Sequence, residues 1–411
     1  MKIPTFSLLL SFVATPFIHS IDSNLFECVT DYDASTDYFP EKVAPNDSQQ
    51  WDIEYYNNYK ILTNKIANDG QGETYLLYQC GTEPPSSEVE SGKHAVVTSV
   101  PLQDGVALTS TVQITFLELL GLRTQIKSYI GDDQYISSSC MNQLISDGNL
   151  DVYENTTAAS LVEWTDTHPS RIVFDGTYEG MPTSTAVQDQ TVLISAHEEA
   201  SNKAIFEWLE FYSAFFNAEG LASQIVNETA ARYDCVASNA DTLAEDDGTN
   251  PVAVWGYYSN YPGFEGWNVA TCDPVVNYYC EYAKACDMEL LTSDASMTHK
   301  EFSEFAKDAD VFFYVSSDWE DVYKNNSAWL DDFKSVKNQQ VYDYQLPGPN
   351  AWFEQRLAEY GTYISRVWVP FCHLSVVYST YSLTGSFCTS LSGVFDRCCL
   401  GRLLHNSKQD D

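Results

Sequence analysis

A long helical pattern near the middle of the chain constrains the fold more than any other feature. Apolar side chains recur there at the 3.6-residue spacing of a helix, namely Ile205, Trp208, Leu209, Tyr212, Phe215 and Phe216. After Gly220 the helical register continues from Leu221 to Val236. An aromatic stripe of this kind is typical of core packing. We therefore expect a linking helix over residues 198–240, with a separate lobe on each side.

Short apolar runs with strand character alternate with helical patterns on both sides of this segment. Before it, strands are expected at 95–101, 171–176 and 191–195, with a helix over 107–122. After it, strands are expected at 251–258, 311–315 and 341–344, with helices over 274–287, 300–307 and 352–364. Alternation of strands and helices is typical of α/β units around a largely parallel sheet. The predicted fold class is α/β, with lobes at 91–197 and 250–368.

Residues 21–90 have a different character and predict a β-rich extension. Runs rich in Tyr and Leu at 55–62 and 75–80 read as strands, and Asn68-Asp69-Gly70 between them is a strong turn sequence. We expect a long hairpin. The prolines and serines of 84–87 then form a linker.

Both ends of the chain are set apart from the fold. Lys2 and the apolar run from Phe6 to Ala14 are typical of a secretory signal peptide, which we assign to residues 1–20. Residues 369–411 are rich in Ser, Leu and Cys, show little periodicity, and are interpreted as an unstructured tail. Secretion predicts a final location outside the cell, on its surface or in an endomembrane compartment.

Cysteine usage and glycosylation sequons agree with that route. The chain has 11 Cys and no C-x-x-C motif, which favours structural disulfides. We expect a Cys28–Cys80 bond and a bond between two of Cys272, Cys280 and Cys286. Four N-x-Ser/Thr sequons predict glycans at Asn46, Asn155, Asn227 and Asn325.

Charge and motifs exclude several classes of function. With 58 acidic against 21 basic residues, the chain lacks the basic clusters that bind nucleic acid or anionic membranes. It contains no G-x-S-x-G, P-loop, G-x-G-x-x-G or H-E-x-x-H motif, and no two of its seven His lie at i, i+2 or i, i+4. We predict neither catalytic residues nor a metal site. A carbohydrate-active enzyme stays open as a minor alternative, because aromatic surfaces also stack sugars.

Aromatic residues at expected strand ends are the main candidates for a ligand site. Six aromatics fall between Trp255 and Trp267, in a segment whose Gly and Pro predict a loop. In doubly wound sheets the loops after the strands form the ligand crevice. A cleft of aromatic rings with a few amides and hydroxyls suits a large, flat, partly apolar ligand. The candidate residues are Ser110, Thr111, Trp255, Tyr257, Tyr258, Trp267, Trp319, Asn350 and Trp352.

Several segments resemble the class III periplasmic binding proteins, the substrate-binding components of ABC importers for cobalamin, ferric siderophores and related ligands. The resemblance covers roughly residues 28–368. It is carried by His94 to Pro101, Trp208 to Phe211, Ala231 to Tyr233 and Lys337 to Tyr342, and by Asp37 to Val43, Tyr59-Lys60 and Gln79 to Thr82. The last three segments look like those of an extended branch of this family that is found in cyanobacteria and algae.

The resemblance implies two α/β lobes bridged by one rigid helix, with the ligand held between them and only small closure on binding. The nearest branch acquires cobalamin in diatoms and other algae, which implies cobalamin as ligand. A branch that binds ferric hydroxamate siderophores is the alternative. Both imply a monomer that delivers its ligand to a membrane transporter or uptake receptor and needs no cofactor of its own. The membrane anchor of some algal relatives is not evident in this sequence.

Overall fold

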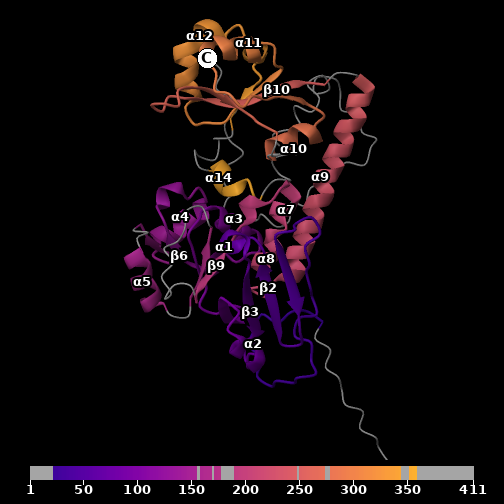
Figure 1. Ribbon diagram of the computed structural model, residues 1–411, viewed down its shortest axis with the longest axis vertical. Helices are drawn as coiled ribbons and strands as arrows, with labels where there is room; N and C mark the ends of the chain where they lie inside the picture. Colours follow the sequence, from indigo (N-terminus) through magenta and orange to yellow (C-terminus); the bar gives the residue numbers. More distant parts are fainter. Residues whose placement is uncertain are drawn as a thin grey trace, which may run out of the picture.

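Two lobes connected by a long helix form the molecule, as seen in a computed structural model (Figure 1). The structure describes residues 22–154, 158–168, 171–176, 189–247, 250–273, 278–343 and 351–358. The predicted signal peptide (1–20) and tail (369–411) lie outside these residues. Within them, no helix is both long and apolar enough to cross a membrane.

The N-terminal extension forms a four-stranded sheet with the order β1-β2-β3-β4. Its strands are β1 (Trp51–Tyr55), β2 (Tyr59–Asn64), β3 (Glu73–Gln79) and β4 (Val96–Val100), with the short helices α1 (Ala67–Gly70) and α2 (Ser86–Ser91) in its connections. The antiparallel pairing of β2 with β3 confirms the predicted hairpin. One expectation is corrected: β4 pairs in parallel with β3, so this strand belongs to the extension's sheet and not to the parallel sheet that follows.

The first lobe is built on a five-stranded sheet with the order β7-β6-β5-β8-β9, in which every pair is parallel. Its strands are β5 (Val106–Leu108), β6 (Ile126–Ile130), β7 (Asp151–Tyr153), β8 (Ile172–Asp175) and β9 (Thr191–Leu193). The connecting helices are α3 (Val112–Leu119), α4 (Ser139–Ser146) and α5 (Ala158–Thr167), with 3-10 turns η1 (Arg123–Gln125), η2 (Asp133–Tyr135) and η3 (Ala196–Glu198). The predicted parallel α/β arrangement is confirmed.

The linking segment is helical, as expected, but it is three helices and not one. They are α7 (Asn202–Phe206), α8 (Trp208–Ser213) and α9 (Glu219–Asp247). Between α8 and α9, Asn217 adopts a left-handed backbone conformation with φ 55°, which a continuing right-handed helix does not allow. The 29-residue α9 then runs along the side of the molecule from the first lobe to the second (Figure 1).

The second lobe has a mixed five-stranded sheet. Parallel pairs join β10 (Val252–Ser259) to β12 (Glu289–Leu291) and to β13 (Val311–Tyr314), and β13 to β14 (Val341–Tyr342). The helices are α10 (Tyr278–Ala285), α11 (His299–Ala306), α12 (Trp319–Leu330) and α13 (Lys334–Lys337). The later helix α14 (Ala351–Gln355) returns to the first lobe and lies beside α3 (Figure 1). An antiparallel strand, β11 (Gly266–Val269), pairs with β10. The segment 255–267 is therefore a hairpin. The predicted loop is confirmed only for residues 260–265, because 255–259 and 266–267 are strand residues.

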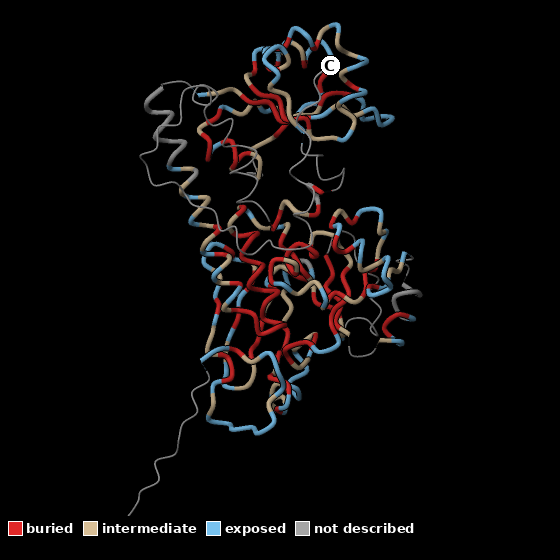
Figure 2. Tube along the Cα trace, turned by 180° about the vertical axis from the view of Figure 1, so that it is seen from behind, coloured by how far each residue is buried: buried red, intermediate tan, exposed pale blue. Residues whose placement is uncertain are grey.

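Among the described residues, burial follows two main cores and a small third cluster of Ala107, Ile130, Trp164 and Val173 in the first lobe (Figure 2). The larger one includes residues of the extension, the first lobe, α8 and α9, and it reaches the α10 side of the second lobe's sheet. The smaller one lies on the opposite side of that sheet, where Trp267, Phe302 and Phe312 pack together. Successive side chains of a strand point to opposite faces, which is why Phe313 belongs to the first core and Phe312 to the second.

Disulfides confirm the expectations from cysteine usage. Cys28 is bonded to Cys80, and Cys272 to Cys280. Cys235 in α9 and Cys286 after α10 are also disulfide-bonded. The first bond closes the extension onto itself, and the second ties Cys272, which follows β11, to α10.

Candidate functional site at the switch point of the first lobe

The strand order of the first lobe identifies where its ligand crevice should lie. β5 and β8 are neighbours, but the chain leaves β5 towards β6 and β7 on one side and leaves β8 towards β9 on the other. Loops that diverge from the carboxyl ends of such a strand pair leave a crevice, which is the usual ligand site of open α/β sheets. In this chain the two loops begin at Thr109 and Gly176.

Hydrogen bonds hold these two loops together. The hydroxyl of Thr109 donates to Asp175 Oδ1 at 2.8 Å, and the amide N–H of Gly176 donates to the Thr109 hydroxyl oxygen at 3.1 Å. The side-chain oxygen of Gln113 accepts from the amide of Thr109 at 3.2 Å and from that of Ser110 at 3.3 Å. The backbone around Ser110 is thereby fixed before α3 begins.

Gly176 allows the loops to approach closely. A Cβ atom at this position would lie 2.8 Å from the Cβ of Ser110 and 3.6 Å from the side-chain nitrogen of Gln113. A larger residue would therefore push the β5–α3 loop away from β8. Ser110, Gln113 and Gly176 occupy one small region at the carboxyl edge of the sheet.

Two predicted site residues, Ser110 and Thr111, lie at this crevice. Both are half-buried, and Thr111 immediately precedes α3 without using its side chain as a cap. Figure 1 shows α3 in the part of the first lobe that faces the second lobe, directly beside α14. Their role in ligand binding stays a prediction.

Trp255 and Trp267 do not present surfaces to a ligand, which corrects the interpretation of the aromatic segment. The Trp255 ring is 4% exposed and lies against Tyr278, Tyr279 and Phe313. Trp267 is 0% exposed, and its ring stacks on Phe302 at 4.1 Å. Because the hairpin alternates faces, it directs each of these rings into one of the two cores.

The other predicted aromatics fall into separate environments. Tyr257 is exposed, whereas Tyr258 is half-buried and stacks on His299 with ring centres 5.0 Å apart. Trp319 is half-buried at the start of α12, against Phe312 and Tyr314. Asn350 lies outside the described residues. Trp352 lies in α14, and its side chain is not among those described.

At the tip of the β10–β11 hairpin lie two aromatics of the predicted 255–267 segment that were not chosen as site residues. Tyr261 and Phe264 are 68% and 71% exposed, and their ring centres lie 6.1 Å apart. Sequence reasoning also missed Gln113, Asp175 and Gly176. These three residues can be recognised only from the pairing of β5 with β8, and no local sequence pattern predicts that pairing.

Polar contacts at α10 set the position of the second lobe on the first. The carboxylate of Glu281 accepts from the amide of Asn202, the first residue of α7, at 2.7 Å. The guanidinium of Arg356, just after α14, lies 4.0 Å from the ring centre of Tyr278. Burial raises the pKa of Glu281. Through α7 and α14, these contacts connect α10 to the lobe that carries the crevice.

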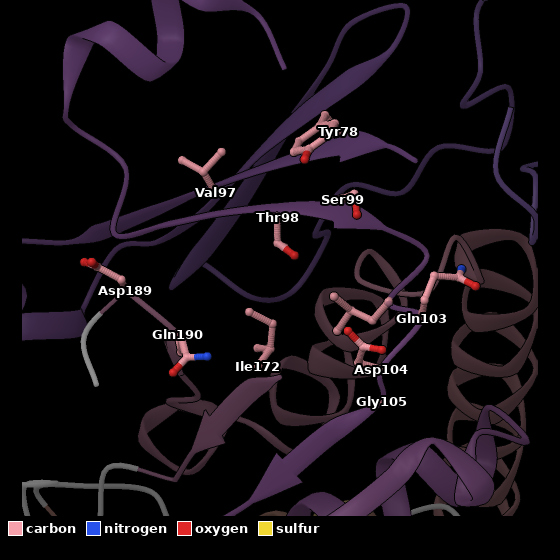
Figure 3. Close-up of a pocket in the computed structure, with 11 residues that line it drawn as sticks. Tyr78, Val97, Thr98, Ser99, Gln103, Asp104, Gly105, Ile172, Asp189 and Gln190 are labelled. Carbon is pink, nitrogen blue, oxygen red and sulfur yellow. The ribbon is translucent and has the colours of Figure 1, made fainter. Parts of the chain in front are cut away.

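A cavity at the other end of the same sheet provides a useful contrast (Figure 3). It measures ≈ 260 Å³ and is lined by residues of β3 and β4 and by residues at the amino ends of β5 and β8. The side chains of Thr98, Asp104 and Gln190 surround it, with Ile172 between them. Ligand crevices of open α/β sheets lie at the carboxyl ends of strands, so this cavity is at the wrong end.

The described residues include no group of three His, Cys, Asp or Glu side chains arranged to hold a metal ion. Three predicted glycosylation sites, Asn46, Asn227 and Asn325, are exposed. The fourth, Asn155, lies outside the described residues.

Comparison with known proteins gives distant matches. No family model matches the chain. An uncharacterized lipoprotein of Methanocaldococcus jannaschii is 22% identical over 290 residues, which is 68% of each protein.

Solved structures that resemble part of this chain include two binding proteins and a transport protein. A periplasmic binding protein from Veillonella parvula covers 64% of this chain and 85% of its own length, with a TM-score of 0.46 and 11% identity. The siderophore-binding protein BauB, solved with acinetobactin and ferric iron, covers 66% and 93%, with a TM-score of 0.48 and 15% identity. An Fe3+-hydroxamate transport protein from Saccharomonospora viridis covers 63% and 93%, with a TM-score of 0.40 and 13% identity.

Proposed function

We propose that this chain is an extracellular solute-binding protein that holds a ferric hydroxamate siderophore between its two lobes and delivers it to a membrane transporter or uptake receptor. The observation that carries the proposal is the topological switch point between β5 and β8, in a lobe joined to a second lobe by α9. The proposal assigns no catalytic step to the chain.

The charge of the crevice favours a neutral ligand. Five polar side chains lie near the start of α3 and the end of β8: Thr109, Ser110, Thr111, Gln113 and Asp175. They offer three hydroxyl groups, one amide and one carboxylate, and none of them is a cation. The whole chain carries a formal charge of −37. Ferric trihydroxamates are neutral, whereas ferric triscatecholates are strongly anionic and would be repelled. Hydroxamates also present carbonyl oxygens that hydroxyl and amide groups can bind.

Burial of two indoles weakens the cobalamin alternative. In that interpretation Trp255, Tyr257, Tyr258 and Trp267 cover a face of the corrin ring, and the two Trp rings are core residues of the second lobe. Tyr257, together with the hairpin-tip rings of Tyr261 and Phe264, provides a smaller exposed aromatic surface. Such a surface suits the apolar flank of a compact siderophore better than a broad planar ring system.

Isothermal titration calorimetry with ferrichrome and with cyanocobalamin tests the proposal. We expect ferrichrome to bind and cyanocobalamin not to bind. Replacing the two hydroxyl residues together, Ser110→Ala with Thr111→Val, should weaken ferrichrome binding by about tenfold, the loss of one to two net hydrogen bonds. Thr98→Val in the cavity of Figure 3 is the matched control and should bind as the unmodified protein does. Tight cyanocobalamin binding without ferrichrome binding would reverse the ligand assignment.

Glycosylation is part of the same proposal, since a secreted protein made by a eukaryotic cell passes the glycosylation machinery. Asn46, Asn227 and Asn325 are exposed, so each can carry a glycan without unfolding. Mass spectrometry before and after treatment with peptide N-glycosidase should detect glycans at these positions. Absence of all three modifications in protein secreted from eukaryotic cells would contradict this part.

A further inference from the structure

One buried amide group at the crevice lacks a partner in the part of the chain that the structure describes. Gln113, in the first turn of α3, is 1% exposed, and its side-chain nitrogen Nε2 makes no hydrogen bond there. Buried polar groups in native proteins almost always have partners, so an exception calls for a functional explanation.

The orientation of this amide is determined by its other end. Gln113 Oε1 accepts hydrogen bonds from the backbone amides of Thr109 and Ser110. An exchange of the oxygen and nitrogen would place the NH2 group against two N–H donors, which is unfavourable. The nitrogen is therefore held on the other side of the amide, close to Gly176, where an added Cβ would lie 3.6 Å from Nε2.

The side-chain nitrogen of Gln113 is directed towards the switch point between β5 and β8. Gly176 follows the carboxyl end of β8, and Ser110 lies just after that of β5, so Nε2 lies close to the first residues of both connections. The start of α3 adds positive electrostatic potential at the same place. The carboxylate of Asp175, bonded to the Thr109 hydroxyl, adds negative charge nearby. A donor in such surroundings suits a neutral acceptor oxygen better than a carboxylate or phosphate.

We propose that Gln113 Nε2 donates a hydrogen bond to a carbonyl-type oxygen of the bound ligand. This inference rests on the proposed function and adds to it one specificity-determining residue and the chemistry it selects. Oε1 shapes the β5–α3 loop, and Nε2 recognises the ligand. A ligand oxygen that reaches Nε2 also lies beside the Ser110 side chain.

Two substitutions separate these two roles. Gln113→Glu keeps an oxygen that can accept from Thr109 and Ser110 but replaces the donor by a second acceptor. Gln113→Leu removes both functions. Gln49→Glu, at an exposed position of the extension, is the control for the change in charge. We expect Gln113→Glu to bind ferrichrome at least tenfold more weakly than the unmodified protein and Gln49→Glu to bind it equally well.

A spectroscopic measurement on the unmodified protein covers the case in which a variant does not fold. In protein labelled with 15N-glutamine, the side-chain NH2 signal that is absent from Gln113→Leu belongs to Gln113. If no folded Gln113→Leu is obtained, Gln113 is identified as the side-chain signal with nuclear Overhauser contacts to the Thr109 and Ser110 amides. Addition of gallium-loaded ferrichrome, which is diamagnetic, should shift this signal downfield.

The outcomes distinguish the inference from the proposed function. Unchanged ferrichrome affinity in Gln113→Glu, or an unshifted Gln113 signal at saturation, would overturn the inference while the siderophore-binding function stands. If the unmodified protein binds neither ferrichrome nor cyanocobalamin, the proposed function fails first, and the inference fails with it.

Discussion

Lys60 and Glu219 form an ion pair in which neither side chain has any exposed surface. Lys60 lies in β2 of the extension, and Glu219 is the first residue of α9. Asn217 accepts from the Lys60 ammonium at 3.0 Å, and Asn24 donates to the second oxygen of Glu219 at 2.8 Å. The pair therefore fastens the N-terminal extension to the helix that links the lobes.

Breaking this pair on one side should strongly destabilise the fold. Glu219→Ala leaves the Lys60 ammonium buried without its counter-charge, and the expected loss in the free energy of unfolding is about 3–5 kcal/mol. Urea denaturation measures it. The double variant Lys60→Met with Glu219→Leu should recover much of that loss, because neither charge is then buried alone. A double variant as unstable as the single one would show that the ionic contact itself is required.

Glu210 should make the protein less stable as pH rises through neutrality. Burial, together with the nearby Glu207, raises the pKa of Glu210 to about 8. The usual value in an unfolded chain is about 4.3. Between these values the folded state binds more protons than the unfolded state, so the free energy of unfolding falls with pH, by up to about 1.4 kcal/mol per unit.

Glu210→Gln removes this titration and is the variant to compare. Its free energy of unfolding, measured with urea, should decline less than that of the unmodified protein between pH 5 and pH 8. Both pH values lie in the range between the unfolded and folded pKa values of Glu210. Equal slopes for the two proteins would contradict the assignment of the raised pKa to Glu210.

Trp267 should act as a core residue and not as a ligand contact. Its ring stacks on Phe302, and its N–H donates to His299 Nδ1 at 2.9 Å. Trp267→Ala should cost about 3–5 kcal/mol of stability. Trp267→Phe keeps an aromatic ring there and should leave ferrichrome affinity unchanged, as measured by calorimetry. A large loss of affinity in a folded Trp267→Phe protein would restore the original prediction for this residue.

The Cys28–Cys80 and Cys272–Cys280 disulfides should contribute unequally to stability. Cys28–Cys80 spans a sequence separation of 52, and Cys272–Cys280 spans 8. From the loop-closure entropy of the unfolded chain, we expect losses of about 4 and about 2.5 kcal/mol when each pair is replaced by serines. Urea denaturation under non-reducing conditions compares them. A larger effect from the shorter loop would mean that native contacts near α10, and not chain entropy, dominate.

Much of the fold follows from local sequence patterns. The apolar runs at 95–101, 171–176, 191–195, 251–258 and 311–315 all contain strands, because buried strands need continuous apolar side chains whatever their partners. Pairing was harder to predict. The strand β4 looks like the start of the first lobe in sequence, yet it pairs with β3, which depends on contacts that no local pattern encodes.

The candidate site was predicted only in part, for a related reason. Ser110 and Thr111 were found because they follow the loop after the strand expected at 95–101. The sequence pattern placed them inside a helix over 107–122, whereas in the structure residues 106–108 form β5 and α3 begins at Val112. Gly256 and Pro262 suggested a loop, but Gly266–Val269 pairs with β10 and turns Trp267 into the core under α11. Gln113 was missed because its importance depends on Gly176, which lies far away in sequence and is brought close by the pairing of β5 with β8.

A crystal structure of the protein with gallium-loaded ferrichrome tests the central claim most directly. The account predicts ligand density at the carboxyl ends of β5 and β8, in contact with Ser110 and Thr111 and facing the second lobe. Density in the cavity beside Thr98 and Gln190, at the opposite end of the sheet, would contradict it.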